Sequence, residues 1–123
     1  MTYEEMCKYV FSHERVDWEI RKMKLKKRQL VQARQISIYL GDWFYPHLTF
    51  EKLTEPFEQS RYLSLHSIKT VKSLMYSDRQ FKSRVDRYLN AIRNQIKAEK
   101  EAELQEETYQ QNDFYTEMEL KTN

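Results

Sequence analysis

The sequence predicts an all-α protein built as a compact bundle of about six helices. Glycine occurs once and proline twice among the 123 residues, whereas each normally makes up about 5 to 7% of a protein. Residues that lose little freedom in a helix, such as Leu, Lys, Arg, Gln and Glu, are abundant. Apolar residues also recur at intervals of three and four, which is typical of helices with one buried face. We expect one domain over residues 1–100 and an acidic, partly disordered or helical tail over residues 101–123.

The first two helices are predicted over residues 2–12 and 16–23. Thr2 and Glu5 have the spacing of a capping box, in which two side chains bond to the free backbone groups at a helix start. The second helix is short, and Trp18 is its large apolar anchor. It ends in a run of lysines.

The third predicted helix spans residues 29–44 and forms the centre of the core. Its broad apolar face consists of Leu30, Ala33, Ile36, Leu40 and Phe44. Gly41 lies inside this helix, where it costs up to ~1 kcal/mol relative to alanine. We therefore expect a close packing contact at Gly41.

A short fourth helix is predicted between Thr49, which is a good N-cap, and Pro56, which should end it. The fifth helix is predicted over residues 62–76 and has two distinct faces. One stripe is apolar and consists of Leu65, Ile68, Val71 and Met75. The other carries hydrogen-bonding side chains, namely Tyr62, His66, Lys69, Thr70 and Ser73.

The sixth helix is predicted to begin at a second capping box, formed by Ser77 and Gln80, and to continue to about residue 100. Its apolar positions are Phe81, Val85, Tyr88, Ile92 and Ile96. Beyond residue 100 the clear period is lost, so we expect a fraying helix followed by a flexible tail.

Positive and negative charges are separated along the chain. Residues 1–100 contain 20 Lys and Arg against 12 Asp and Glu, a net charge of +8, whereas residues 101–123 have a net charge of −6. Five of the basic residues lie within residues 22–28, directly before the third helix. A basic body favours a polyanionic partner, although basic surfaces also occur in proteins that bind no nucleic acid.

The fourth and fifth predicted helices have the layout of a helix-turn-helix, whose second helix enters the major groove of DNA. Arginine can bond to guanine, and lysine, serine, threonine and histidine can reach bases or phosphates. An amphipathic helix whose polar face is simply solvated has the same pattern. Periodicity alone therefore leaves both interpretations open.

Two stretches of the sequence resemble the C-terminal DNA-binding domain of the bacterial replication initiator DnaA. They are "KKRQLVQARQISIYL" and "LHSIKTVKSLMYSDRQFKSRVDRYLNAI", and the likeness covers residues 3–96. The resemblance implies a helical domain, also similar to the Trp repressor, in which a helix-turn-helix recognises a short duplex element. It further implies that the preceding basic loop reaches the backbone and minor groove, and that the protein acts in replication initiation or its regulation.

The resemblance also implies roles for individual residues. Lys27 and Arg28 match the basic loop of the family, and Arg34 matches an arginine at the start of the long helix. Gln32 takes the place of an arginine that some family members insert into the minor groove. His66 takes the place of the family's second histidine in the recognition helix.

The turn before the fifth helix departs from the family pattern. The segment "EQSRYLS" replaces a glycine-containing turn and the Asp-His and Thr-Val pairs with which the family contacts bases. Arg61 is the candidate for a substitute base contact, the alternative being a non-specific site, and the family's usual target sequence does not carry over to this chain. The predicted DNA-binding residues are Lys24, Lys26, Lys27, Arg28, Gln32, Arg34, Arg61, Tyr62, His66, Lys69 and Thr70.

We expect no enzyme activity, metal centre, cofactor or small-molecule substrate. The three histidines lack an acid at a recurring spacing on one helical face, and Cys7 is the only cysteine. A chain with one glycine has no glycine-rich phosphate loop, so the initiator's ATPase activity is not expected. Without a long apolar stretch or a signal core, we expect a cytoplasmic protein, bacterial or encoded by a phage or mobile element, with no membrane contact.

The main alternative is a protein-interaction module that has kept the initiator fold and lost specific DNA binding. Replication proteins would then be the partners, engaged by the acidic tail or by its aromatic residues Tyr109, Phe114 and Tyr115. A transcription regulator is a second alternative. The tail is either passive or folds over the basic face and competes with DNA.

Overall fold

The structure, a computed structural model, describes the backbone of residues 1–122 and the side chains of residues 1–107. Over residues 1–122 it has five α-helices, two 3-10 turns and no strand. The all-α fold class is therefore confirmed, with five helices in place of about six. The chain divides into two units, Met1–Asn90 and Ala91–Asn123. Within the described residues, no helix is both long and apolar enough to span a bilayer.

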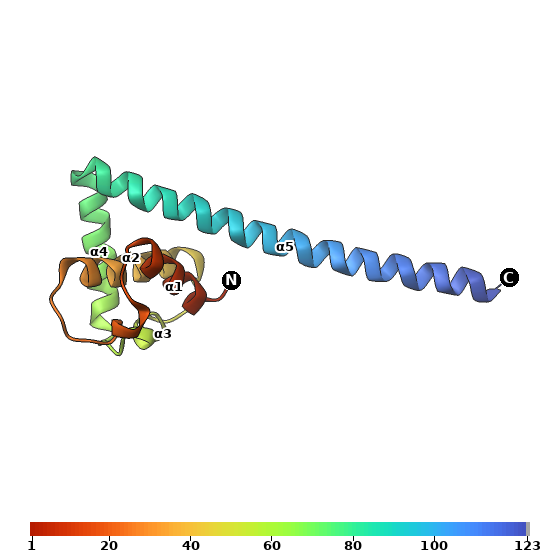
Figure 1. Cartoon of the computed structure of the whole chain (residues 1–123), viewed down its shortest axis with the longest axis horizontal. Helices are drawn as coiled ribbons and strands as arrows, with labels where there is room; N and C mark the ends of the chain where they lie inside the picture. Colours follow the sequence, from red (N-terminus) through yellow and green to blue (C-terminus); the bar gives the residue numbers. More distant parts are fainter. Residues whose placement is uncertain (123) are drawn as a thin grey trace. The chain divides into compact units, whose positions relative to one another are not determined.

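The elements follow one another along the chain as Figure 1 labels them. The α-helices are α1 (Tyr3–His13), α2 (Arg28–Phe44), α3 (Phe50–Thr54), α4 (Tyr62–Ser77) and α5 (Arg79–Thr122). The 3-10 turns are η1 (Trp18–Ile20), between α1 and α2, and η2 (Glu55–Phe57), directly after α3. The first unit contains α1 to α4 and the start of α5, and the second contains the remainder of α5.

Two of the predicted helix starts are confirmed atom by atom. The Thr2 hydroxyl accepts a hydrogen bond from the Glu5 backbone N–H over 3.2 Å, and the Glu5 carboxylate accepts from the Thr2 backbone N–H over 3.3 Å. The Thr49 hydroxyl accepts from the backbone N–H of Lys52 over 3.2 Å. These caps satisfy backbone donors that have no partner within the helix.

The predicted second helix is wrong in extent, because residues 16–23 contain only the single turn η1. Trp18 is nevertheless the anchor that the sequence indicates. Its ring packs edge-on against Phe11 at 5.0 Å and lies 6.2 Å from Phe57, between ring centroids. The turn is therefore fixed by aromatic contacts with α1 and η2, and residues 23–27 beyond it have no regular secondary structure.

The start and the end of the last helix also differ from the prediction. Asp78 caps α5, accepting from the backbone N–H groups of Gln80 and Phe81 over 3.0 and 3.2 Å, whereas the Ser77 hydroxyl donates back to the Ser73 carbonyl. The helix continues beyond residue 100 to Thr122. No glycine or proline follows residue 56 in the sequence, so no helix breaker interrupts it. The side chains of Tyr109, Phe114 and Tyr115 lie outside the described residues.

The core of the first unit is built around α2, which packs against α1 and α4. The predicted apolar face of α2 is confirmed, since Leu30, Ala33, Ile36 and Leu40 are at most 1% exposed. Val71 of α4 is fully buried as well. Figure 1 shows α1, α2, α3 and α4 gathered into one cluster of helices.

The close contact predicted at Gly41 is confirmed. A Cβ atom added at Gly41 would overlap the Tyr3 ring and lie 2.8 Å from a methyl carbon of Leu53. The Tyr3 hydroxyl in turn donates to the Leu53 carbonyl oxygen over 2.7 Å. Gly41 thus lies where side chains of α1 and α3 pack directly against the backbone of α2.

The apolar stripe predicted for α4 needs one correction. Leu65 is 45% exposed, and the serines Ser64 and Ser67 are fully buried in its place. The Ser64 hydroxyl donates to the Phe50 carbonyl over 2.9 Å, which holds the start of α4 against α3. The small side chains of these serines allow α4 to pack closely, and this turns Leu65 outward.

Candidate nucleic-acid interface

The lysine-rich segment before α2 is an exposed loop held in place by one buried arginine. We call residues 22–28 the basic loop. Arg34, which is only 7% exposed, donates from Nε to the Arg21 carbonyl oxygen over 2.8 Å and from Nη2 to the carbonyl oxygen of Met23. Burial lowers the pKa of Arg34 from its usual value, although a guanidinium remains charged at neutral pH. Arg34 therefore supports the loop from inside the fold.

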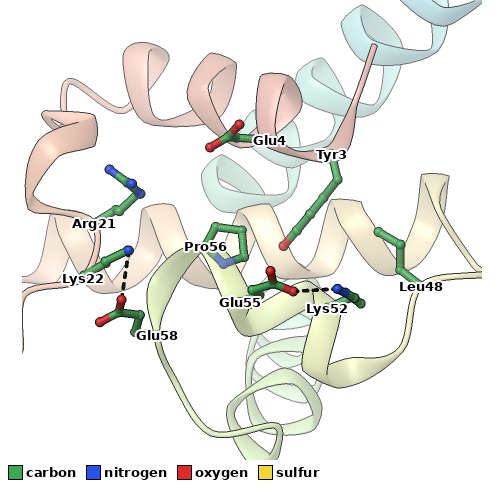
Figure 2. Close-up of a pocket in the computed structure, with 9 residues that line it drawn as sticks. All are labelled: Tyr3, Glu4, Arg21, Lys22, Leu48, Lys52, Glu55, Pro56 and Glu58. Carbon is green, nitrogen blue, oxygen red and sulfur yellow. Dashed lines mark hydrogen bonds and ion pairs between the residues drawn. The ribbon is translucent and has the colours of Figure 1, made fainter.

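The start of the basic loop is joined to the turn that precedes α4. The Lys22 Nζ atom lies 2.9 Å from Oε1 of Glu58. Figure 2 marks this ion pair with a dashed line. Glu58 ends η2 in the left-handed backbone region, with φ of 49°. A glycine occupies such positions most easily, and here a glutamate does so and pairs with the loop.

Four of the five loop cations have no partner within the described residues. The side chains of Lys24, Lys26, Lys27 and Arg28 are exposed, and none of these side chains makes a hydrogen bond or ion pair there. Only Lys22 is neutralised by a carboxylate. The loop therefore presents uncompensated positive charge to solvent.

A short turn connects α3 and η2 to α4. The short helix α3 and its extension η2 lead through residues 58–61 into α4, and α3 packs against α4. The polar stripe of α4 faces solvent, because Tyr62 is 73% exposed and His66 and Lys69 are exposed as well. Thr70 is half-buried.

Arg61 precedes the first turn of α4 and has two weak contacts. Its Nη1 atom lies 3.9 Å from Oε1 of Glu51, and its guanidinium carbon lies 5.3 Å from the centre of the Tyr62 ring. Both side chains of the ion pair are more than half exposed. Exposed ion pairs of this kind contribute little to stability, so Arg61 is free to exchange Glu51 for another partner.

Gln32, on the first turns of α2, is bound to α5 through Arg84. The Arg84 Nη2 atom donates to Gln32 Oε1 over 2.9 Å and lies 3.2 Å from Glu14 Oε1. Tyr88 donates to the other oxygen of Glu14 over 2.6 Å. Burial, and then the bond to Glu14, raise the pKa of Tyr88, which keeps its hydroxyl protonated.

No local sequence pattern distinguishes Arg84, Glu14 or Lys22 as a site residue. Arg84 and Gln32 are 52 residues apart in the chain, and Lys22 and Glu58 are 36 apart. No local spacing connects such pairs. The sequence offers one indication of such a contact. Arg84 lies on the apolar face of α5, next to Phe81 and Val85, where a charged residue is unusual.

A pocket of about 640 Å³ lies next to the basic loop in the first unit. Figure 2 shows its walls, which come from the start of α1, the loop, and the α3–η2 segment. Its lining residues are Tyr3, Glu4, Arg21, Lys22, Leu48, Lys52, Glu55, Pro56 and Glu58. Lys22 pairs with Glu58 and Lys52 pairs with Glu55, so most of its charges compensate one another.

The chain is similar in sequence to the chromosomal replication initiator protein DnaA of Flavobacterium psychrophilum. The two are 30% identical over 79 residues, which is 64% of this chain and 16% of the relative. No protein-family model matches the chain. The chain thus aligns with about one sixth of the length of the curated relative, and that region is related to DnaA.

Proposed function

We propose that the unit Met1–Asn90 binds double-stranded DNA, with the basic loop and α4 engaging the same duplex. The observation that carries this proposal is the ion pair between Lys22 and Glu58, with 2.9 Å between its charged atoms. It ties the start of the loop to the turn that leads into α4. Both side chains of this ion pair are largely exposed, at 43% and 66%, so the pair adds little stability. It shows instead that the loop and this turn lie side by side, where both can contact one duplex.

Electrostatic attraction to phosphates supplies most of the affinity in this proposal. Lys24, Lys26, Lys27 and Arg28 are exposed without an acidic partner among the described residues. Phosphate contacts position a protein on the duplex and release condensed counterions, which makes binding strongly dependent on salt. Lys69 on α4 would add a further phosphate contact.

Base recognition is assigned to the start of α4. Residues at the N-terminus of the second helix of a helix-turn-helix face the base edges. Arg61 lies there, and its guanidinium can donate twice to one guanine. Tyr62, His66 and Thr70 follow along the polar stripe of the helix. Because the segment around Arg61 replaces the residues with which the DnaA family contacts bases, we propose a target sequence different from the DnaA box.

The proposed role is in DNA replication initiation or its regulation. The relationship to the replication initiator DnaA supports this role. Gln32 and Arg34 have different roles in the proposal, since Gln32 is half-buried whereas Arg34 is buried and holds the basic loop. Arg34 therefore acts through the loop and makes no DNA contact of its own.

A protein-interaction role is the second candidate, and exposed apolar side chains favour it. Phe50, Tyr62 and Leu65 are 41%, 73% and 45% exposed, and they lie on α3 and at the start of α4. Neighbouring exposed apolar side chains commonly mark a protein contact. This candidate predicts that a partner protein, rather than a duplex, binds the α3–α4 segment.

A titration of the whole chain with labelled duplexes distinguishes the two candidates. We expect binding to both a random duplex and a DnaA-box duplex, with affinity falling steeply between 50 and 200 mM salt. Similar affinities for the two duplexes are expected, because the usual base-contacting residues are replaced. Absence of binding to either duplex at 50 mM salt would contradict the proposal and favour the interaction role.

A further inference from the structure

We propose that Arg84 is a positioning residue that holds the Gln32 amide with its NH2 group turned outward, so that Gln32 donates hydrogen bonds to acceptor atoms of the bound DNA. The inference rests on the proposed function and adds a recognition residue to it. Its basis is the chain of contacts Tyr88–Glu14–Arg84–Gln32, with atom-to-atom distances of 2.6, 3.2 and 2.9 Å.

The chemistry of the side chains determines which group donates and which accepts in each contact of this network. A guanidinium can only donate, and an ionised carboxylate can only accept. The Arg84 N–H groups must therefore meet the oxygen of the Gln32 amide and the oxygen of Glu14. The Gln32 nitrogen, with its two donors, then points away from Arg84.

The network is also held firmly by its surroundings. The Glu14 side chain is 10% exposed, and Tyr88 is 5% exposed. The Arg84 guanidinium lies over the Phe81 ring, with 5.1 Å between its carbon and the ring centre. The Arg84 side chain itself is 38% exposed, so these contacts rather than burial set the amide orientation before DNA arrives. Such preorganisation lowers the entropic cost of binding.

Gln32 lies where a DNA-bound loop would bring acceptor atoms near. It follows Arg28 by four residues on α2, and residues at this spacing share one helix face. An outward NH2 group suits adenine N3 and thymine O2 in the minor groove, or a phosphate oxygen. It opposes the guanine amino group, which is itself a donor.

The inference is tested by a double-mutant cycle on DNA affinity with Gln32→Met and Arg84→Met. We expect each single variant to bind an A·T-rich duplex about three- to tenfold more weakly. The double variant should bind no more weakly than Gln32→Met, because Arg84 acts through Gln32. If the two losses multiply, Arg84 acts independently of Gln32 and the inference is wrong.

Matched variants control for charge and for folding. Arg87→Met removes the same charge three residues along α5 and should weaken binding less than Arg84→Met does. Arg84→Lys keeps a donor beside Glu14 and should restore affinity. If Arg84→Met unfolds because Glu14 is left unpaired, the cycle is run with Glu14→Gln in all four proteins. Equal losses for Arg87→Met and Arg84→Met would contradict the inference.

Inosine substitution distinguishes the two acceptor sources, since inosine lacks the minor-groove amino group of guanine. If Gln32 meets a base edge, the wild type prefers inosine over guanine and Gln32→Met loses that preference. If it meets a phosphate, Gln32→Met weakens every duplex by the same factor. A wild type that binds no duplex overturns the proposed function itself, whereas a binding wild type with independent losses overturns this inference alone.

Discussion

The Nε atom of Arg34 lies 2.8 Å from the carbonyl oxygen of Arg21, so a residue of α2 holds the backbone that enters the basic loop. A second bond, from Nη2 to the Met23 carbonyl, fixes the next part of the same segment. These carbonyls accept from a side chain instead of from the backbone of a continuing helix. The bonds thus hold the irregular segment between η1 and α2 in place.

Replacing Arg34 by methionine should lower the free energy of unfolding by about 1.5 to 3 kcal/mol, because two hydrogen bonds from a charged group are lost. Urea unfolding followed by circular dichroism measures this change. Arg28→Met, which removes an exposed arginine of the same helix, is the matched control and should leave stability within about 0.5 kcal/mol. Unchanged stability together with lost DNA affinity in Arg34→Met would instead make Arg34 a direct contact.

Alanine substitution of Lys69 and of Arg61 should affect DNA affinity in different ways. Lys69→Ala removes a phosphate contact and should weaken all duplexes alike. Arg61→Ala removes a paired bond to guanine and should cost about 1 to 3 kcal/mol of discrimination between the selected site and random DNA. Site selection from a random duplex pool, followed by competition with bulk DNA, measures both effects. Equal losses on every duplex in Arg61→Ala would contradict base recognition by this residue.

Gly41→Ala should destabilise the fold by about 1 to 3 kcal/mol, despite the higher helix propensity of alanine, because the added methyl group meets the Tyr3 ring and Leu53. Thermal and urea unfolding report the difference. Combining it with Tyr3→Ala makes room for the methyl group, so the two changes together should cost less than their sum. A Gly41→Ala protein more stable than the wild type would mean that α1 does not pack here.

Arg15 is the second non-glycine residue with positive φ, at 59°, and it closes α1. The Val16 N–H bonds to the Phe11 carbonyl over 2.9 Å, and the Arg15 N–H bonds to the Ser12 carbonyl over 3.2 Å. This is the helix ending that usually carries a glycine. Arg15→Gly should therefore raise the free energy of unfolding by about 0.5 to 1 kcal/mol. Arg15→Ala keeps the backbone strain and should show no such gain.

The helices could be predicted where their signals are local. The capping box of Thr2 and Glu5 and the apolar spacing of α2 each lie within a few residues, so both appear in the sequence alone. The close contact at Gly41 was predictable for the same reason, since a glycine inside a helix needs a packing explanation.

The rest of the site depends on contacts between distant parts of the chain. The resemblance pointed to Arg34 as a DNA contact, but its side chain turns inward to the loop carbonyls. Leu65 fits the apolar period of α4, yet Ser64 takes the buried position because its hydroxyl meets the Phe50 carbonyl. The link between Arg84 and Gln32 spans 52 residues, and no local pattern indicates it.

The most direct test of the central proposal is the salt dependence of duplex affinity in the wild type and in Lys26→Ala/Lys27→Ala/Arg28→Ala. If the loop and its neighbours neutralise roughly four to six phosphates, the slope of log affinity against log salt is about −4 to −5 in the wild type, and it flattens by up to ~3 in the triple variant. A control with Lys8, Arg93 and Lys97 changed to alanine loses the same charge outside the loop and should keep the wild-type slope. Equal flattening in both variants, or a wild-type affinity that does not respond to salt, would contradict DNA binding by the basic loop.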